Sequence, residues 1–428
     1  MNKNNQKILS IVDQKKEDLI ELTKELIKIP TLNPPGINYL EICEFIQKRF
    51  ASSGFETQLI RAFETPGDSD KFPRWNLVCR KEGKAKGNSI HFNGHIDVVE
   101  TGKHWTVDPF EGYEMNGKIY GRGSCDMKGG IASAIIAVES YIEFNPDFCG
   151  SIELSFTADE ETGGYGGVAY LAEKGFFSPN RVNNVIIPEP LNKERICLGH
   201  RGVWWAEIET HGKIAHGSMP FLGDSAIRHM GAVLQEFESH LYPLLNKKQT
   251  QMPVVPEGAK RSTLNINSIH GGEKELGKEF TGYPAAVVAD NCSIIIDRRF
   301  LIEEDIKDVK DEVYEILSRL KGERKNFSYT IRDLHEVIPT MAERDSDLVI
   351  KLSQSIEEII GHQPEYVISP GTYDQKHIDR IGKLKNCVAY GPGILDLAHQ
   401  PDEYIVIQDM IDSSKIMLLA TSKMLEKG

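Results

Sequence analysis

The sequence predicts an α/β fold, in which a mostly parallel sheet has helices on both faces and is interrupted by a smaller ferredoxin-like α+β domain. Helical and strand patterns alternate up to about residue 200 and again beyond residue 339, and the part between them has the order βαββαβ. A chain of 428 residues is also longer than one compact core usually needs. We therefore predict a first domain formed by residues 1–202 and 339–428, and a second domain inserted at residues 203–338.

Two amphipathic helices are expected near the N-terminus, because apolar side chains recur there every three or four residues and each run ends near a proline or glycine. Short apolar runs and a helix rich in small residues follow. The helices are Asp18–Ile29, Tyr39–Ser52 and Gly129–Phe144, and the strands are Asn76–Cys79, Ser89–Asn93, Ser151–Thr157 and Val185–Ile187. Buried strands that alternate with helices are typical of a parallel sheet.

The inserted segment is expected to contain four strands and two helices in the ferredoxin-like order. The strands are Val203–Thr210, Thr263–Ile269, Ala286–Asp297 and Asn326–Asp333, and the helices are Asp224–His240 and Glu303–Leu320. Glycines at residues 271, 272 and 322 fall where the connections should be. Beyond the insertion, a helix at Asp345–Ile360 and a strand at Asn386–Tyr390 return to the α/β pattern.

Composition and charge exclude several classes of function. The formal charge of −13, with acidic and basic residues interspersed, weighs against nucleic acid, whose binding requires basic side chains that neutralise phosphates. No apolar stretch approaches the roughly 20 residues that span a bilayer, and Met1–Lys16 lacks the apolar run of a signal peptide. The scattered cysteines form no Cys-x-x-Cys pair, which argues against a disulfide framework or a thiolate zinc site. We expect a cytoplasmic protein that binds neither nucleic acid nor membranes.

Candidate metal ligands begin with His95, which follows the strand at Ser89–Asn93. Asp97 lies two residues further on, so that on an extended segment both side chains point to the same side. Asp97 could accept a hydrogen bond from the second ring nitrogen of a histidine ligand. Taken by itself, the pair is also explained by a surface histidine and a turn aspartate.

A glycine-rich loop carries the next candidate, Asp126. In Tyr120-Gly-Arg-Gly-Ser-Cys-Asp126-Met-Lys-Gly-Gly130 the glycines allow the backbone to approach a ligand closely. The lysine and hydroxyl pattern of a phosphate-binding P-loop is absent. A carboxylate inside such a loop suits a cation better than a phosphate, and Asp126 is a natural bridging ligand between two metal ions.

Two adjacent glutamates, Glu160 and Glu161, follow the strand at Ser151–Thr157. Their carboxylates repel each other unless a positive charge lies nearby, and one of them can bind a metal while the other transfers a proton. An acidic helix start is the alternative, since the helix dipole favours carboxylates there. The pair Gly163-Gly164 that follows makes this alternative less convincing.

Two further candidates complete the set: Glu189, which follows the strand at Val185–Ile187, and His399, which lies late in the chain. Together the five residues offer imidazole and carboxylate groups and no thiolate. This donor set fits a hydrolytic site for two zinc ions, or for zinc with cobalt or manganese.

Six motifs occur in an order and at spacings that resemble those of one metallopeptidase family: GHIDVV, YGRGSCDMKGG, ADEETGG, PEP, GKIAHGSMP and HQPDE. The chain resembles the family of acetylornithine deacetylase, succinyl-diaminopimelate desuccinylase, aminoacylase-1 and the zinc-dependent glutamate carboxypeptidases. The likeness covers nearly all 428 residues. It implies a catalytic domain interrupted by a lid domain, two Zn²⁺ ions (with Co²⁺ or Mn²⁺ as substitutes) and a homodimer that forms through the lid.

The resemblance also implies a role for each candidate. His95 and Glu189 would bind one metal ion, Glu161 and His399 the other, and Asp126 both. Two neighbours of these ligands would take part in catalysis: Glu160 as the general base, and Asp97 as the partner of His95.

In the lid, His216 matches the histidine that in dimeric members reaches the partner's active site and stabilises the oxyanion. The resemblance associates four further positions with the substrate: Asn265, Arg298, Gly371 and Thr372. Arg299 stands beside Arg298, and the sequence leaves open which arginine faces the site.

The expected function is hydrolysis of the amide bond of a small N-acyl amino acid or related N-acyl amine, as in the deacetylase and desuccinylase branch. A water that bridges the metals would lose its proton to Glu160, which would later protonate the leaving amine. Deformylase, carbamoylase, dipeptidase and carboxypeptidase activities on the same two metals stay open, as does a catalytically inactive metal-binding relative. A nucleophilic serine or cysteine hydrolase is disfavoured because Gly-x-Ser-x-Gly is absent. Tyr373 and Gln375 are either walls of the substrate pocket or filler.

Overall fold

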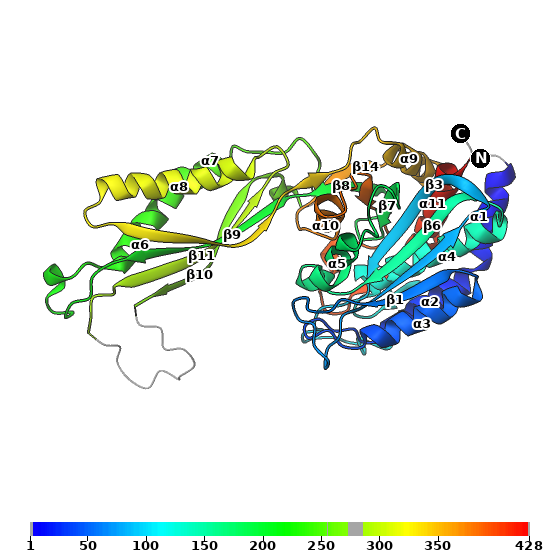
Figure 1. Ribbon diagram of the computed structural model, residues 1–428, viewed down its shortest axis with the longest axis horizontal. Helices are drawn as coiled ribbons and strands as arrows, with labels where there is room; N and C mark the ends of the chain where they lie inside the picture. The colour runs from blue at the N-terminus through cyan, green and yellow to red at the C-terminus, as the bar shows by residue number, and fades with distance from the viewer. Residues whose placement is uncertain (1–2, 255, 273–285, 427–428) are drawn as a thin grey trace. The chain divides into compact units, whose positions relative to one another are not determined.

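The computed structural model describes residues 3–254, 256–272 and 286–426 (Figure 1). The chain divides into two compact units. The larger unit contains Met1–Gly199, Met341–Val367 and Tyr373–Gly428, and the smaller unit contains His200–Thr340 and Ile368–Thr372.

A nine-stranded sheet, most of whose strands belong to the larger unit, has the order β1-β2-β6-β3-β7-β15-β8-β13, with β14 paired to β8. The four strands β6, β3, β7 and β15 are parallel, whereas β1, β2 and β8 pair antiparallel with their neighbours. The strands are β1 Glu56–Arg61, β2 Trp75–Glu82, β3 Ala85–His95, β6 Cys149–Thr157, β7 Asn184–Ile187, β8 Arg195–His200, β13 Thr340–Met341, β14 Glu365–Ser369 and β15 Cys387–Ala389. The mostly parallel sheet predicted from the sequence is confirmed.

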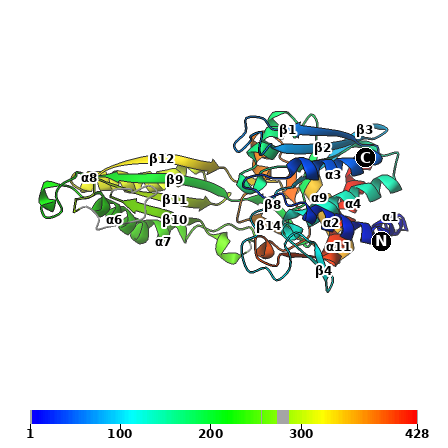
Figure 2. The same cartoon turned by 90° about the horizontal axis from the view of Figure 1, so that it is seen from below.

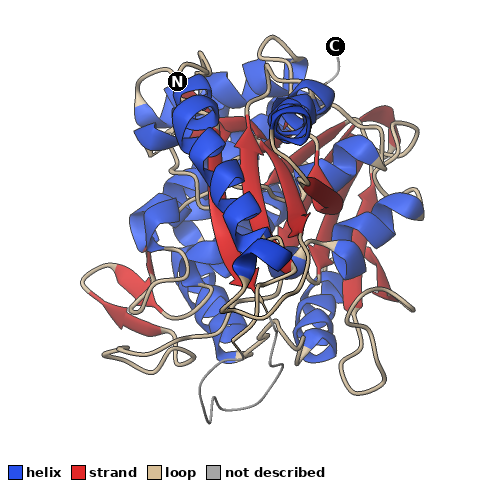
Figure 3. Ribbon diagram, turned by 90° about the vertical axis from the view of Figure 1, so that its left-hand side faces the viewer, coloured by secondary structure: helices blue, strands red, loops and turns tan. Residues whose placement is uncertain are grey.

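Helices pack on this sheet and on one another (Figure 3). The helices are α1 Lys3–Gln14, α2 Lys16–Lys28, α3 Tyr39–Ser52, α4 Gly129–Phe144, α5 Tyr170–Glu173, α9 Asp347–Ile360, α10 Gln375–Arg380 and α11 Ile407–Leu425. Helix α4 is buried over most of its surface, because it packs against α11, α1 and α2 and lies next to β3. The small residues of α4, on which the helix prediction rested, let these neighbours approach closely.

The sequence prediction missed the two terminal helices, α1 and α11. The N-terminal segment reads as polar because of its lysines and asparagines, yet Ile8, Leu9 and Val12 form a buried stripe at helical spacing. This stripe packs on α4 and α11.

In the smaller unit, four antiparallel strands form a sheet in the order β10-β11-β9-β12, which Figure 2 shows in that sequence. The elements are β9 Gly202–His211, α6 Ala226–Glu236, α7 Tyr242–Leu245, β10 Thr263–Gly271, β11 Asn291–Phe300, α8 Ile306–Glu323 and β12 Ser328–Val337. Trp204, Ile208 and Ile294 of the sheet share one core with Val233 of α6 and Val313 of α8. The predicted ferredoxin-like order is confirmed.

One predicted strand of this unit begins later than expected. Strand β11 starts at Asn291, whereas the sequence placed its start at Ala286. The Ala286 carbonyl accepts a hydrogen bond from the Gly217 N–H (2.6 Å), and Val288 N–H donates to the Ala215 carbonyl (2.8 Å). Residues 286–288 therefore pair with the loop after β9 and not with the sheet.

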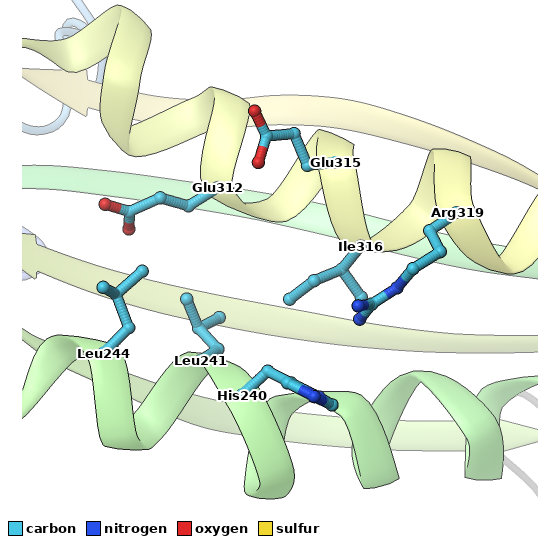
Figure 4. A pocket seen from close by; sticks show the side chains of 7 residues that line it. All are labelled: His240, Leu241, Leu244, Glu312, Glu315, Ile316 and Arg319. Atoms are coloured by element: carbon cyan, nitrogen blue, oxygen red, sulfur yellow. The ribbon is translucent and has the colours of Figure 1, made fainter.

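A small sheet, β16-β5-β4, joins Tyr404–Val406 to the hairpin formed by Lys118–Tyr120 and Tyr113–Met115. In the smaller unit a pocket opens between α8 and the helical segment that leads into α7, lined by His240, Leu241, Leu244, Glu312, Glu315, Ile316 and Arg319 (Figure 4). No helix within the described ranges is both long and apolar enough to cross a membrane.

Candidate metal centre

Three of the predicted ligands lie at the carboxyl ends of neighbouring parallel strands. His95 is the last residue of β3, Glu161 follows the end of β6, and Glu189 follows the end of β7. Because β6, β3 and β7 are parallel neighbours, their carboxyl ends meet at one edge of the sheet. Open α/β sheets bind their ligands at this edge.

Asp126 reaches the same place from the turn Ser124–Lys128, which leads into α4. The Glu403 carboxylate fixes this turn, since it accepts hydrogen bonds from the backbone N–H groups of Cys125 (2.9 Å) and Asp126 (3.1 Å). Glu403 is itself paired with the Arg122 guanidinium, and both side chains are buried. The sequence contained both residues within its motifs but gave no signal that they contact each other.

Gly130 lets the start of α4 approach the loop that carries Glu189. A Cβ atom at residue 130 would lie 1.9 Å from the carbonyl oxygen of Pro188, which is far inside van der Waals contact. Only glycine therefore permits this close packing, and the packing sets the separation between the Asp126 turn and Glu189.

The five predicted ligands form two groups that share Asp126. His95 Nε2 lies 3.0 Å from Asp126 Oδ1 and 4.0 Å from Glu189 Oε1. His399 Nε2 lies 3.4 Å from Asp126 Oδ2 and 3.1 Å from Glu161 Oε1. In each group the ligand atoms all lie within 4.8 Å of one another. Each oxygen of Asp126 thus faces one group, which is the arrangement of a carboxylate that bridges two metal ions.

Buried negative charge dominates this centre. Burial raises the pKa of the Glu189 carboxyl well above its ordinary range, and repulsion by Asp126 raises it further. Burial likewise raises the pKa of Glu161 to about 7, although its hydrogen bond with His399 acts in the opposite direction. Carboxylates that are this unfavourable to ionise without a partner are stabilised when a cation binds between them.

The donor set tests which cation fits. Imidazole nitrogens and carboxylate oxygens without a thiolate suit Zn²⁺, Co²⁺ or Mn²⁺. A magnesium site would instead use mainly carboxylates and water, and a calcium site six to eight oxygens. The residues present therefore fit a pair of transition-metal dications. His95 and Glu189 would hold one ion, Glu161 and His399 would hold the other, and Asp126 would contact both.

Asp97 is fully buried beside His95, but its contacts differ in part from the expectation. The His95 Nδ1 donates a hydrogen bond to the main-chain carbonyl of Asp97 (3.0 Å), whereas the Asp97 carboxylate lies 3.6 Å away. The carboxylate instead accepts hydrogen bonds from the backbone N–H groups of Glu160 (3.2 Å) and Glu161 (3.1 Å). It also accepts one from the Asn33 amide (2.8 Å). Asp97 thus positions the His95 ring and the glutamate loop at once.

Glu160 lies next to this centre but in neither group of ligands. Its carboxylate lies 3.5 Å from the Lys376 ammonium, and both side chains are largely buried. Asp374 lies nearby, and burial followed by repulsion from Glu160 raises the pKa of Asp374 to about 7. The sequence prediction passed over Lys376 and Asp374; oppositely charged side chains two residues apart, just after Gly371 and Thr372, were the available signal.

His216 belongs to the smaller unit and lies in the exposed loop after β9. Its Nδ1 accepts a hydrogen bond from the Ser218 backbone N–H (3.1 Å) and contacts the Ser218 hydroxyl (2.7 Å). A neutral ring whose Nδ1 accepts a hydrogen bond carries its proton on Nε2. The Nε2–H group is then a hydrogen-bond donor.

The expectation that Arg298 holds the substrate is corrected. Arg298 is fully buried, and its guanidinium pairs with Glu304 (2.9 Å) and Glu312 (3.2 Å) inside the smaller unit. Side chains alternate along a strand, so that Arg298 points into the helix-covered core while Arg299 points to the opposite face. The register of β10 and β11 places Asn265 opposite Asp297, on the face of Arg299.

Asn265 is exposed on that face, where its amide donates to the Asn267 side-chain oxygen (2.8 Å). Gly371 and Thr372 are partly exposed and group with the smaller unit, although the sequence placed them in the first domain. The cause is a contact within that unit, in which Arg201 Nε donates to the Pro370 carbonyl (3.0 Å). Substrate contacts of Asn265, Gly371 and Thr372 stay predictions.

Tyr373 and Gln375 are buried residues of the core and do not line a substrate pocket. The Tyr373 hydroxyl donates to Gln375 Oε1 (2.6 Å), and the Gln375 amide donates to the carbonyls of Leu198 (3.0 Å) and Cys387 (2.6 Å). Both side chains are buried, so that they support the segment before α10 from within.

Comparison with known proteins identifies a relative in sequence and several proteins of similar fold. The chain is 29% identical over 402 residues to a probable succinyl-diaminopimelate desuccinylase of Staphylococcus epidermidis, covering 91% of this chain and 93% of the relative. Human carnosine dipeptidase 1 has a similar fold, with a TM-score of 0.73 at 18% identity over 99% of both chains. A dinuclear metal-binding peptidase from Bacillus subtilis also has a similar fold, with a TM-score of 0.67 at 14% identity over 96% of this chain and 99% of that one.

The family described as peptidase family M20/M25/M40 matches residues 91–423. This match confirms the resemblance seen in the six motifs and the prediction of a hydrolase that acts on carbon–nitrogen bonds. It spans the predicted ligands, the glutamate pair and the whole of the smaller unit. The chain belongs to peptidase family M20/M25/M40.

Proposed function

We propose that the protein hydrolyses the amide bond of a small N-acyl amino acid, using two divalent metal ions held by His95, Asp126, Glu161, Glu189 and His399. The observation that supports this most strongly is the position of Asp126, whose two oxygens each face one histidine and one glutamate. We propose zinc as the metal, because the donor set suits it. Such ions polarise the scissile carbonyl and lower the pKa of water.

The proton transfers are assigned to Glu160. It lies next to the ligand groups without belonging to either, and its backbone is held by Asp97. In this position the carboxylate takes a proton from the attacking water and later delivers it to the leaving amine nitrogen. Glu161, although adjacent in sequence, faces His399 and serves as a ligand.

His216 is proposed to stabilise the carbonyl oxygen as negative charge develops on it. Its Nδ1 accepts a hydrogen bond, which leaves Nε2–H as the donor that an oxyanion requires. By family resemblance this histidine acts in the site of a partner subunit, so that we propose a homodimer formed through the smaller unit. The expected cytoplasmic location stays a prediction.

The identity of the acyl group is proposed from the relatives. Proteins that share 28–29% identity with the chain over about nine tenths of its length are named desuccinylases, which makes N-succinyl-diaminopimelate the first substrate to test. N-acetyl, N-formyl and N-carbamoyl amino acids and dipeptides complete the panel. Faster release of amine from any of them than from N-succinyl-diaminopimelate would reassign the acyl group while keeping the chemistry.

Replacing the general base tests the mechanism. Glu160→Gln is expected to lower kcat by roughly 100- to 10,000-fold, because a positioned base supplies about this factor. Its metal content, measured by mass spectrometry, should stay at the wild-type value. Glu173→Gln, an exposed change on α5, is the matched control. Loss of metal from Glu160→Gln would make Glu160 a ligand and contradict the assignment.

A mixed dimer tests the role of His216. His216→Ala should lower kcat by about 100- to 1,000-fold, the usual effect of removing one oxyanion donor. Differently tagged His216→Ala and Glu160→Gln chains are co-expressed, and the heterodimer is purified. If His216 acts across the dimer, one of its two sites is complete, and about half of the wild-type rate per dimer returns. An inactive heterodimer, or a monomeric active enzyme, would exclude action on the partner.

A further inference from the structure

Lys376 is a buried cation next to the proposed general base. The second residue of α10, it is only 4% exposed, and its Nζ lies 3.5 Å from Glu160 Oε1. Within the described ranges no other ion pair of Glu160 is found. We propose that Lys376 is a positioning residue, whose ammonium holds the Glu160 carboxylate away from the two groups of metal ligands. The inference rests on the proposed function of Glu160.

The backbone around Glu160 is already fixed, which leaves the direction of its side chain to be determined. The Asp97 carboxylate accepts hydrogen bonds from the N–H groups of both Glu160 and Glu161. Glu161 turns toward His399 at 3.1 Å. From the neighbouring position, Glu160 has the same chemistry as Glu161 and would be attracted by the same cations.

A carboxylate that binds a metal ion is a weaker base, because the positive charge of the ion stabilises its ionised form. Two dications in the neighbouring ligand groups would attract Glu160 strongly, because charges in a buried site are poorly screened. Lys376 is a compact positive charge, and its Nζ lies 3.5 Å from one oxygen of the carboxylate. It competes with the metals for one oxygen and leaves the second oxygen for the proton transfer.

The backbone that carries Lys376 is held by hydrogen bonds on both sides. The His377 Nε2 donates a hydrogen bond to the Gly163 carbonyl (2.7 Å), which attaches the first turn of α10 to the glutamate loop. On the other side the Asn93 amide of β3 donates to Asp374 (3.1 Å). Lys376 lies between these two attachments in sequence, so that its backbone is held on both sides, and the burial of its side chain restricts where the ammonium can go.

Removing the charge of Lys376 should lower kcat without lowering zinc affinity. Lys376→Met keeps most of the length of the side chain and removes its charge. The value of kcat should fall about 100-fold, because a displacement of roughly 1 Å in a catalytic group has this effect. Zinc affinity, measured by competition with a chromophoric chelator, should rise or stay equal, since Glu160 is freed to bind metal. Lys376→Arg should keep most of the activity. Lys385→Met, at an exposed lysine just after α10, is the matched control.

Making the same change in the Glu160→Gln variant distinguishes a positioning role of Lys376 from a merely structural one. In Glu160→Gln, adding Lys376→Met should leave zinc affinity unchanged, because the carboxylate that gains from the loss of Lys376 is gone. Lys376→Gln replaces Lys376→Met if the latter does not fold. Unchanged kcat in Lys376→Met, or a fall in zinc affinity together with kcat, would overturn the proposal. A wild-type enzyme without amide hydrolysis would instead overturn the proposed function, so that the two failures are distinct.

Discussion

Each unit of the molecule buries a cluster of charged side chains, and the two clusters differ in how their charge is balanced. In the smaller unit the cluster contains two cations and two carboxylates, namely Arg298, Lys248, Glu304 and Glu312. In the larger unit three carboxylates meet two imidazoles, in Asp126, Glu161, Glu189, His95 and His399. The first cluster is balanced by the protein itself, and the second is not.

The pKa values of Glu304 and Glu189 reflect this difference. In the smaller unit burial opposes ionisation of Glu304, but Arg298 and Lys248 lower its pKa below the ordinary range. In the larger unit burial and the charge of Asp126 raise the pKa of Glu189. A balanced cluster is a structural ion pair, whereas an unbalanced one is built to receive positive charge from outside.

Removing the metal ions should have the largest effect on activity. It also tests most directly whether the unbalanced cluster requires positive charge from outside the protein. Treatment with EDTA is expected to abolish amide hydrolysis, and Zn²⁺, Co²⁺ or Mn²⁺ should restore it. The thermal midpoint should also fall, since ions that bind only the folded chain stabilise it. Activity is measured as amine release, and the metal content is measured by mass spectrometry. An enzyme that keeps its activity after all metal is gone would remove the basis of the proposed function.

Breaking the balanced cluster should instead change stability without changing metal content. Arg298→Met leaves Glu304 and Glu312 with Lys248 alone, and loss of one partner from a buried pair costs about 3–5 kcal/mol. Unfolding in urea is followed by fluorescence, to which Trp204 and Trp205 of the smaller unit contribute. Arg299→Met, on the opposite face of β11, is the control and should have a small effect on stability. Equal stability of the two variants would contradict the burial of Arg298.

Much of the fold and of the metal centre could be predicted because local pattern carried the information. The candidate ligands stand next to strand ends, and parallel strands must bring those ends to one edge of the sheet. His95 and Glu189 therefore lie in one group of ligands and Glu161 in the other, with Asp126 shared by both. The predicted substrate contact of Arg298 was wrong because the sequence Asp-Arg-Arg does not tell which arginine faces the core. The pairing of β10 with β11 decides this. Lys376 and Glu403 were missed because their partners lie far away in the chain. Such contacts exist only after folding.

The smallest effect is expected from a change at Glu403. This residue does not belong to the unbalanced cluster, but it supports the turn that carries Asp126. Its carboxylate accepts hydrogen bonds from the backbone of Cys125 and Asp126 and pairs with Arg122. Glu403→Gln keeps the shape of the side chain but removes its charge. Groups that orient a metal ligand typically contribute about 10- to 100-fold in metal affinity, and zinc affinity should fall by this factor.

The neighbouring Asp402 provides the matched control for Glu403. Its carboxylate accepts hydrogen bonds from the Thr106 N–H (2.8 Å) and hydroxyl (3.0 Å) at the surface and does not contact the turn of Asp126. Asp402→Asn should therefore leave zinc affinity unchanged. Equal losses of zinc affinity in the two variants would mean that the whole loop after His399 supports the centre, and not the two hydrogen bonds to Glu403. If only Glu403→Gln loses affinity, the unbalanced cluster depends on a buried anion that never contacts a metal ion.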